Sequence, residues 1–228
     1  MVSQNSLIRF EDLSYSIPHG KQILDKINFQ VFEKEFVGLL GKNGAGKTTL
    51  LEILIGLRTP TKGKMDVLNN LKLTENCSED LILISHDITL KKEITIKQFF
   101  EIQSLMYSKY SKKIEQILSE EFEVDPSQLI GSLSTGQQRK LQIISAISSR
   151  PKILLIDELT AVLDPEARHL LFHALKEAQK SYGLSILLAT NIAEDLEGKA
   201  DKVLFLKNKT ITQCLPSEIK NLFKVAKK

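Results

Sequence analysis

GKNGAGKTT, at residues 41–49, is the stretch that decides the fold. It fits the pattern G-x-x-x-x-G-K-[ST], in which a glycine-rich turn points its backbone N–H groups at a phosphate chain. A short apolar run, FVGLL, precedes it at residues 36–40, and residues 49–57 follow with leucine and isoleucine at helical spacing. A buried strand, a turn and a helix in this order predict a phosphate-binding loop in a parallel α/β protein.

Each part of this loop has an expected role. Lys47 should reach the β- and γ-phosphates as a point charge, and Thr48 Oγ1 should bind Mg²⁺. The alternative is a glycine-rich turn without a ligand, which the flanking strand and helix disfavour. The expected ATP-binding positions are Gly41, Lys42, Asn43, Gly44, Ala45, Gly46, Lys47, Thr48 and Thr49.

A second polar site ends another apolar run, KILLIDE at residues 152–158. Asp157 is the expected second anchor of the Mg²⁺ ion, and Glu158 is the expected general base for the attacking water. An acidic pair after a strand is often ordinary loop polarity. Its place about a hundred residues after a phosphate loop favours the catalytic interpretation.

LSTGQ, at residues 133–137, opens a helical pattern that continues over residues 138–149. Ser134, Gly136 and the backbone amides at such a helix start form a second anion grip. Taken by itself, the segment also fits a helix N-cap on Ser134 or Thr135.

The three motifs together resemble the nucleotide-binding subunit of ABC ATPases, from about Tyr15 to Ile211. LSTGQ is similar to the family's LSGGQ signature, with Thr135 in place of a glycine. The resemblance implies an α/β fold: a P-loop NTPase core with a parallel sheet, an N-terminal antiparallel β subdomain and an inserted α-helical subdomain. We expect one ABC ATPase domain over residues 1–228, with residues 1–87 and 132–228 forming the core and antiparallel layer, and residues 88–131 the helical subdomain.

The resemblance also implies a function. ATP and Mg²⁺ are the expected cofactors, and a second ATP-binding subunit, in a homodimer, is the expected partner. The signature residues of one copy, Ser134, Thr135, Gly136 and Gln137, would close on ATP held by the other. Hydrolysis would power a separate transmembrane permease subunit, of exporter type, with the chain in the cytoplasm on the inner face of the membrane. The alternatives are a nucleotide-sensing regulatory module with weak hydrolysis and a soluble ABC ATPase outside transport.

Two further positions follow from the resemblance. Tyr15 matches the aromatic residue that stacks on adenine, although a strand tyrosine is more often simple packing. Asp164, in Leu163-Asp164-Pro165, matches the family's D-loop.

Two expected γ-phosphate sensors depart from the family pattern. His86 stands where a glutamine should contact Mg²⁺, although imidazole is a poor ligand for that ion. Asp87 would supply an oxygen ligand instead if the register shifts by one residue. Asn191 stands where a histidine should end the strand at residues 185–189, and an amide cannot carry a proton. One interpretation is that both positions tolerate substitution. The favoured interpretation is slower or asymmetric ATP hydrolysis. His86 and Asn191 are still expected to be catalytic residues.

Composition sets the remaining limits. A net charge of +3 in 228 residues does not favour nucleic acid as a partner. Cys77 and Cys214 lack metal or redox spacing, and His169 with His173 lacks a third metal ligand. No apolar run is long enough to span a membrane and no leader is evident, so a cytosolic chain is expected. The apolar residues of the helical subdomain are expected to be mostly core, and a groove for a helix of the membrane partner is the alternative for those near 99–107.

Overall fold

The computed structural model describes residues 5–18, 20–68, 79–85 and 90–219. In this part of the chain the strands are β1 (Ser6–Ser16), β2 (Gln22–Phe32), β3 (Phe36–Leu40), β4 (Lys62–Val67), β5 (Leu81–Ser85), β6 (Ile153–Asp157), β7 (Ser185–Thr190), β8 (Lys202–Lys207) and β9 (Thr210–Cys214). The α-helices are α1 (Lys47–Leu54), α2 (Ile96–Met106), α3 (Lys112–Glu121), α4 (Thr135–Ser148) and α5 (Pro165–Tyr182).

The strands form two sheets. One has the order β5-β6-β7-β3-β8-β9 and is parallel except for the antiparallel edge strand β9. The other has the order β2-β1-β4 and is antiparallel throughout. Both the parallel core and the N-terminal antiparallel layer expected from the sequence are confirmed.

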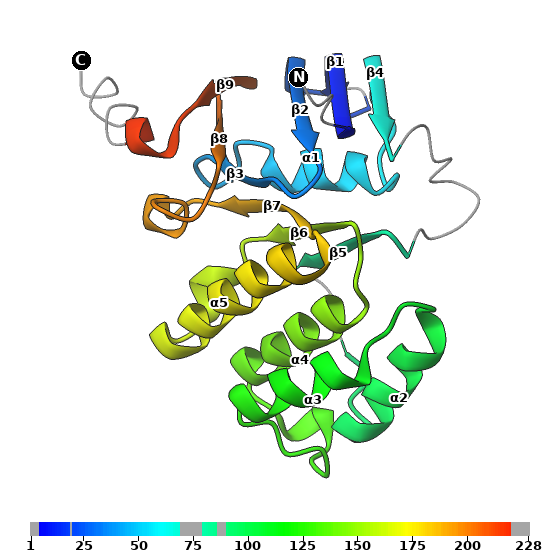
Figure 1. Ribbon diagram of the computed structural model, residues 1–228. Helices are drawn as coiled ribbons and strands as arrows, with labels where there is room; N and C mark the ends of the chain where they lie inside the picture. Colours follow the sequence, from blue (N-terminus) through cyan, green and yellow to red (C-terminus); the bar gives the residue numbers. More distant parts are fainter. Residues whose placement is uncertain (1–4, 19, 69–78, 86–89, 220–228) are drawn as a thin grey trace.

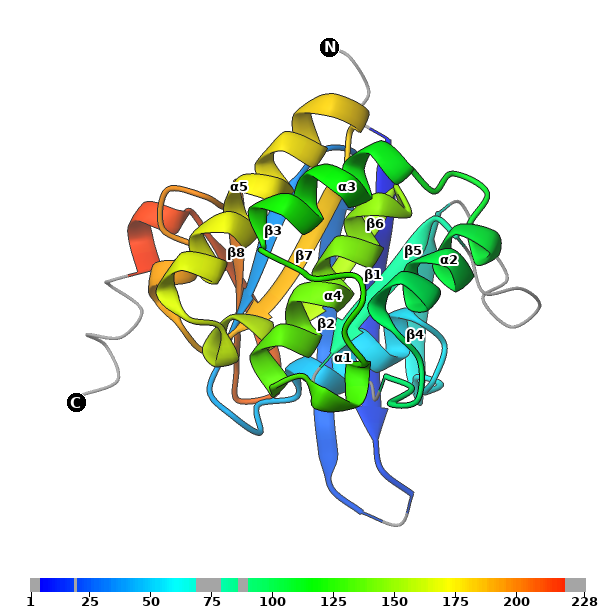
Figure 2. The same ribbon diagram turned by 90° about the horizontal axis from the view of Figure 1, so that it is seen from below.

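The two sheets and the helices form successive layers (Figure 1). Helix α1 lies between the antiparallel sheet and the six-stranded sheet, and α4 and α5 cover the opposite face of the latter. Figure 2 shows α3 lying over α4, and α2 beyond it, on the side away from the antiparallel sheet. One apolar core fills the space around α1, and a second fills the space between the large sheet and α2–α5. Strands β3, β6 and β7 are therefore covered on both faces, and every residue in them is buried.

Local chemistry sets the boundaries of helices α1 and α4. Helix α1 begins at Lys47 rather than residue 49, because Gly46 (φ 110°) turns the chain directly into it, and it ends at Leu54 before the left-handed Gly56. Helix α4 begins at Thr135 with Ser134 as its N-cap, which is one of the two caps predicted. The Ser134 hydroxyl accepts a hydrogen bond from Gln137 N (3.2 Å), and Gln137 Oε1 accepts one from Ser134 N (2.9 Å).

In three other regions the observed elements can be set against those predicted from the sequence. The β8–β9 hairpin is confirmed, whereas β4 lies in a segment where no strand was predicted. Between residues 90 and 131 the described chain contains α2, α3 and a short 3-10 helix, Ile130–Ser132, and no strand. The exact limits of the helical subdomain stay a prediction. The final helix expected after Pro216 appears as the 3-10 helix Pro216–Glu218, and its continuation lies outside the described residues.

Candidate functional site

The expected catalytic residues meet where three neighbouring parallel strands end. Strand β7 lies between β6 and β3, so the carboxyl ends of all three share one edge of the sheet. Leu40 pairs with Thr190, and Asp157 pairs with Ala189. Gly41 N also donates to Thr190 O at 3.3 Å. Segments more than a hundred residues apart in the sequence are therefore held side by side.

The phosphate loop curls around its own lysine. Gly44 (φ 75°) and Gly46 (φ 110°) take backbone conformations that other residues rarely adopt. Lys47 is 3% exposed, and its Nζ donates to Gly41 O (2.9 Å) and Lys42 O (3.2 Å). The loop thus fixes a buried ammonium group at the start of α1, where the helix dipole also favours an anion.

Lys47 also contacts the expected base. Its Nζ lies 2.8 Å from Glu158 Oε1, and the Glu158 side chain is 28% exposed. Glu158 has φ 50°, and its N–H donates to Ala189 O at 3.0 Å, so its backbone is fastened to strand β7. The carboxylate consequently sits over the phosphate loop and remains accessible to water.

The expected metal ligands are also adjacent. Thr48 Oγ1 donates to Asp157 Oδ2 at 2.7 Å, and Asp157 is 1% exposed. A hydroxyl and a carboxylate held together at a phosphate site are hard oxygen donors of the kind Mg²⁺ prefers. The donor set therefore fits the expected ion.

Asn191 follows strand β7 directly and contacts the phosphate loop. Its Nδ2 donates to Asn43 Oδ1 at 2.8 Å, and both residues are exposed. The residue in the place of the expected histidine therefore lies beside the phosphate loop, where its amide donates to Asn43.

The second anion grip lies at the start of α4. Ser134, Thr135 and Gln137 are exposed, and the closest atom to a Cβ added at Gly136 is Val162 O at 3.7 Å. Val162 ends the 3-10 helix Leu159–Val162, which follows Glu158. The signature segment thus packs loosely beside the segment that follows the base and presents its helix start to the exterior.

Comparison with known proteins agrees with this geometry. The family model described as "ABC transporter" matches residues 24–161, more than half of the chain. The chain belongs to the ABC transporter family. It is an ABC-type ATP-binding domain, and ATP hydrolysis is the activity of this family's domains.

Relatives of this ABC domain differ widely in length. It is 32% identical over 214 residues to "ATP-binding cassette sub-family A member 9" of Mus musculus, covering 88% of this chain but 13% of that protein. It is 30% identical over 195 residues to "Nod factor export ATP-binding protein I" of Rhizobium leguminosarum bv. viciae, covering 82% of this chain and 62% of that protein. The structure titled "Structure of ATP binding subunit of ABC transporter" superposes with a TM-score of 0.84 at 27% identity and covers 97% of this chain and 95% of that one.

The D-loop aspartate of this ABC domain has a clear local role. Asp164 caps α5, because its Oδ1 accepts a hydrogen bond from Ala167 N at 2.8 Å. That hydrogen bond holds the pKa of the Asp164 carboxyl below its usual value. The residue is exposed, so its carboxylate is also free to meet a second molecule.

Tyr15 lies differently from what adenine stacking requires. It is 7% exposed and belongs to the core around α1. The Arg58 guanidinium carbon lies 5.7 Å from the centre of the ring, and Arg58 Nη1 donates to the Tyr15 hydroxyl at 3.0 Å. Stacking on a base would need Arg58 to move, so the role given to Tyr15 stays a prediction. Ile17, two residues after Tyr15, has an apolar side chain that is 41% exposed near the turn between β1 and β2.

His86 lies outside the described residues, so its role also stays a prediction. Among the described residues, no three His, Cys, Asp or Glu side chains gather where they could hold a metal. Likewise, no helix in the described ranges is long and apolar enough to cross a membrane.

Sequence reasoning missed one group of residues behind the site. Thr160, Arg168, Thr190 and Asp195 meet in a buried hydrogen-bond network. They come from four separate segments and match no phosphate-binding pattern. The only local signal was the position of two of them, Thr160 and Thr190, beside Glu158 and Asn191.

Proposed function

We propose that this chain is the ATP-hydrolysing subunit of a membrane transporter. In this proposal two copies dimerise on Mg·ATP and drive a separate membrane-spanning subunit of exporter type, with the chain in the cytoplasm at the inner face of the membrane. The likeness to an ATP-binding subunit named for Nod factor export supports the exporter assignment.

The strand-end site has the groups that hydrolysis requires. Lys47 would bind the β- and γ-phosphates, and Glu158 would accept the proton of the attacking water. Asn191 would donate one hydrogen bond to the γ-phosphate. Thr48 and Asp157 would hold Mg²⁺, which would neutralise charge on the phosphates.

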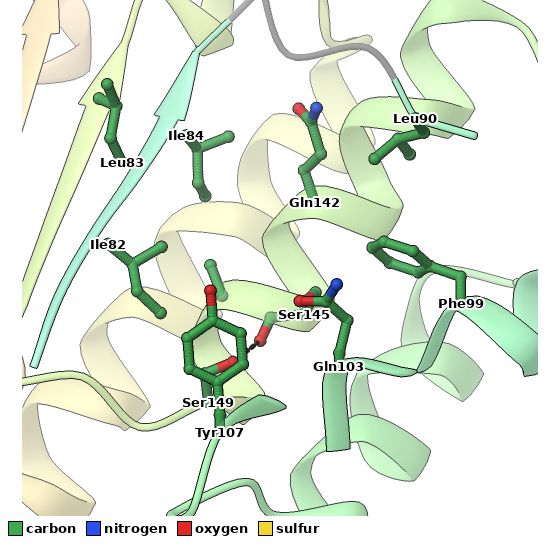
Figure 3. Close-up of a pocket in the computed structure, with 11 residues that line it drawn as sticks. Ile82, Leu83, Ile84, Leu90, Phe99, Gln103, Tyr107, Gln142, Ser145 and Ser149 are labelled. Atoms are coloured by element: carbon green, nitrogen blue, oxygen red, sulfur yellow. Dashed lines mark hydrogen bonds between the residues drawn. The ribbon is translucent and has the colours of Figure 1, made fainter. Parts of the chain in front are cut away.

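The observation that carries the membrane partner is a groove that shares no lining residue with the phosphate loop. A cavity of about 210 Å³ lies between β5, α2 and α4, in the region where a groove for a partner's helix was the alternative prediction. Figure 3 shows Ile82 and Ile84 on one side of it, Leu90 and Phe99 on the other, and Gln142 between them. Its lining mixes apolar side chains with amides and hydroxyls, as a partly polar helix would require.

An exposed apolar strip lies on the same helix as one wall of this groove. On α2, Ile102 (43% exposed), Leu105 (87%) and Met106 (60%) are spaced three and four residues apart and share one face. Apolar patches of this kind mark protein interaction sites. Strip and groove together would bind an amphipathic helix of the membrane subunit.

The test of this docking site pairs the chain with any membrane-spanning protein that a neighbouring reading frame encodes. Leu105→Glu should prevent co-purification of the two proteins in detergent while ATP turnover of the isolated chain stays unchanged. Gln116→Glu is the matched control, since it adds the same charge on exposed α3. Equal co-purification of Leu105→Glu and the parent would reject the docking site.

The dimer is tested separately through the base. Glu158→Gln should bind ATP, stop hydrolysis and trap a dimer, because an amide cannot accept the proton of water. Size-exclusion chromatography with Mg·ATP measures the shift, and Glu177→Gln on the exposed part of α5 is the control. A Glu158→Gln chain that stays monomeric and hydrolyses ATP at the parent's rate would contradict both the assignment of Glu158 as base and the dimer.

One observation favours a second candidate, the regulatory module with weak hydrolysis. Asn191 lies at the phosphate loop but offers only a neutral amide. A low turnover number that persists in complex with the membrane subunit would favour this candidate over an ordinary transport ATPase.

A further inference from the structure

A buried carboxylate lies directly behind the catalytic edge of the sheet. Asp195 ends the short 3-10 helix Ala193–Asp195 and is 0% exposed. Its Oδ2 accepts hydrogen bonds from Thr160 Oγ1 (2.6 Å) and Thr190 Oγ1 (3.1 Å). Its Oδ1 accepts from Arg168 Nε at 2.6 Å and pairs with the same guanidinium through Nη2.

This arrangement is not what packing alone favours. A buried ion pair is often no more stabilising than apolar residues of the same volume, because removing charges from water is costly. Here the carboxylate is fully engaged by two hydroxyls and one guanidinium, and each donor comes from a different element. Such a network fixes the relative positions of the segments that supply the donors.

The two hydroxyls stand next to the catalytic positions. Thr160 lies two residues after Glu158, in the 3-10 helix Leu159–Val162. Thr190 ends β7 and immediately precedes Asn191, and its Oγ1 also accepts from Ile192 N at 3.0 Å. Thr160 and Thr190 are each 1% exposed, so neither hydroxyl has water as an alternative partner.

We propose that Asp195 is a positioning residue for ATP hydrolysis. By binding both threonines through one oxygen, it fixes the base Glu158 relative to the γ-phosphate donor Asn191. Through Arg168, which lies on α5, it also connects these two positions to the helix that begins at the D-loop. This inference rests on the role of Glu158 as base given under the proposed function.

The expected effect is on the chemical step and not on nucleotide binding. Lys47 and the loop that grips the phosphates make none of the bonds just described, so affinity should not depend on Asp195. Misplacing a base or donor by about 1 Å can reduce a rate about a hundredfold. Loss of one hydroxyl should therefore lower kcat about tenfold or more.

The test removes each hydroxyl while keeping the shape of the side chain. Thr160→Val and Thr190→Val each delete one donor to Asp195, and Thr160→Ser and Thr190→Ser keep it. We expect the valine variants to lose about tenfold or more in kcat with ATP dissociation constants within about twofold of the parent. The serine variants should recover most of the rate. Thr210→Val, at an exposed turn, controls for the substitution itself.

The outcomes separate the possibilities. Valine variants with the parent's kcat would overturn the inference. So would a parallel loss of kcat, ATP affinity and melting temperature that serine does not rescue, because that pattern belongs to a purely structural network. If one valine variant does not fold, the other and Asp195→Asn provide the same comparison. If Glu158 is not the base, Glu158→Gln should hydrolyse ATP at the parent's rate, and that result does not depend on the threonine variants.

Discussion

The two anion grips of this chain differ in how far the chain itself completes them. The phosphate loop is joined to the strand ends by Lys47–Glu158, Thr48–Asp157 and Asn43–Asn191 contacts. The signature segment is fixed at its helix start by its own capping box, between Ser134 and Gln137, and Ser134, Thr135 and Gln137 are exposed. A site with internal partners can bind its ligand in a single chain, whereas an outward-facing site is open to a ligand held by another molecule, as the proposed dimer requires.

The largest expected effect tests the phosphate loop, which is the anion site with partners inside the same chain. Lys47→Ala should remove tight ATP binding, because the loop loses its buried ammonium group. The loss should be about 2–5 kcal/mol, which is about 30-fold or more in affinity. A fluorescent ATP analogue measures it, and Lys176→Ala on exposed α5 is the control. Affinity retained within a few-fold would mean that the loop binds something else.

The next effect tests the outward-facing grip. Gly136→Asp should leave ATP binding to the isolated chain within about twofold while lowering turnover by about a hundredfold, because a carboxylate would oppose the phosphates of a second copy. Gly136→Ala is the matched control, since its Cβ would meet no atom closer than 3.7 Å. If Gly136→Asp weakened ATP binding as strongly as Lys47→Ala, the two grips would not be separate.

A gain in ATP turnover is expected from a substitution at Asn191, which contacts the phosphate loop. Asn191→His should raise turnover about tenfold, because a charge-assisted hydrogen bond to the γ-phosphate is worth about 1.5–3 kcal/mol. The measurement is steady-state hydrolysis at saturating Mg·ATP. Asn191→Ala, which only removes the amide, should lower the rate. Unchanged turnover in the histidine variant would show that the amide is a tolerated substitution.

The smallest effect concerns the base of the nucleotide. Because the Tyr15 ring is buried beneath Arg58, Tyr15→Leu should change ATP affinity less than about twofold and reduce stability by about 1 kcal/mol through loss of the Arg58 hydrogen bond. Calorimetry and nucleotide titration provide the two values. A tenfold loss of affinity in Tyr15→Leu that Tyr15→Phe does not share would establish stacking on adenine.

The sequence predicted those parts of the molecule whose determinants are local. An apolar run fixed strand β3 at residues 36–40, and a glycine-rich turn after it fixed the phosphate loop, because backbone conformation and burial there depend on neighbouring residues. The N-cap of α4, predicted at Ser134 or Thr135, is Ser134, because the hydrogen bonds that cap a helix join residues close in sequence.

Contacts between distant segments were not predictable in the same way. Arg58 meets Tyr15 across 43 residues, and Thr160 meets Asp195 across 35. No periodicity encodes such a pairing, since it depends on how strands cross over in the sheet. Strand β4 was missed for a related reason: its buried partner, β1, precedes it by about fifty residues and supplies the pairing that its own sequence does not indicate.

The ion pair between Lys47 and Glu158 has a consequence for the order of phosphate binding and water activation in the proposed reaction. Lys47 has three N–H donors, and its acceptors here are two loop carbonyls and the Glu158 carboxylate. An arriving γ-phosphate must exchange with one of them, and the carboxylate is the only one that comes from another strand. In the proposed reaction, the same exchange would therefore release Glu158 to accept the proton of water. Re-forming the pair after phosphate departs would offset part of the affinity for product and so favour turnover.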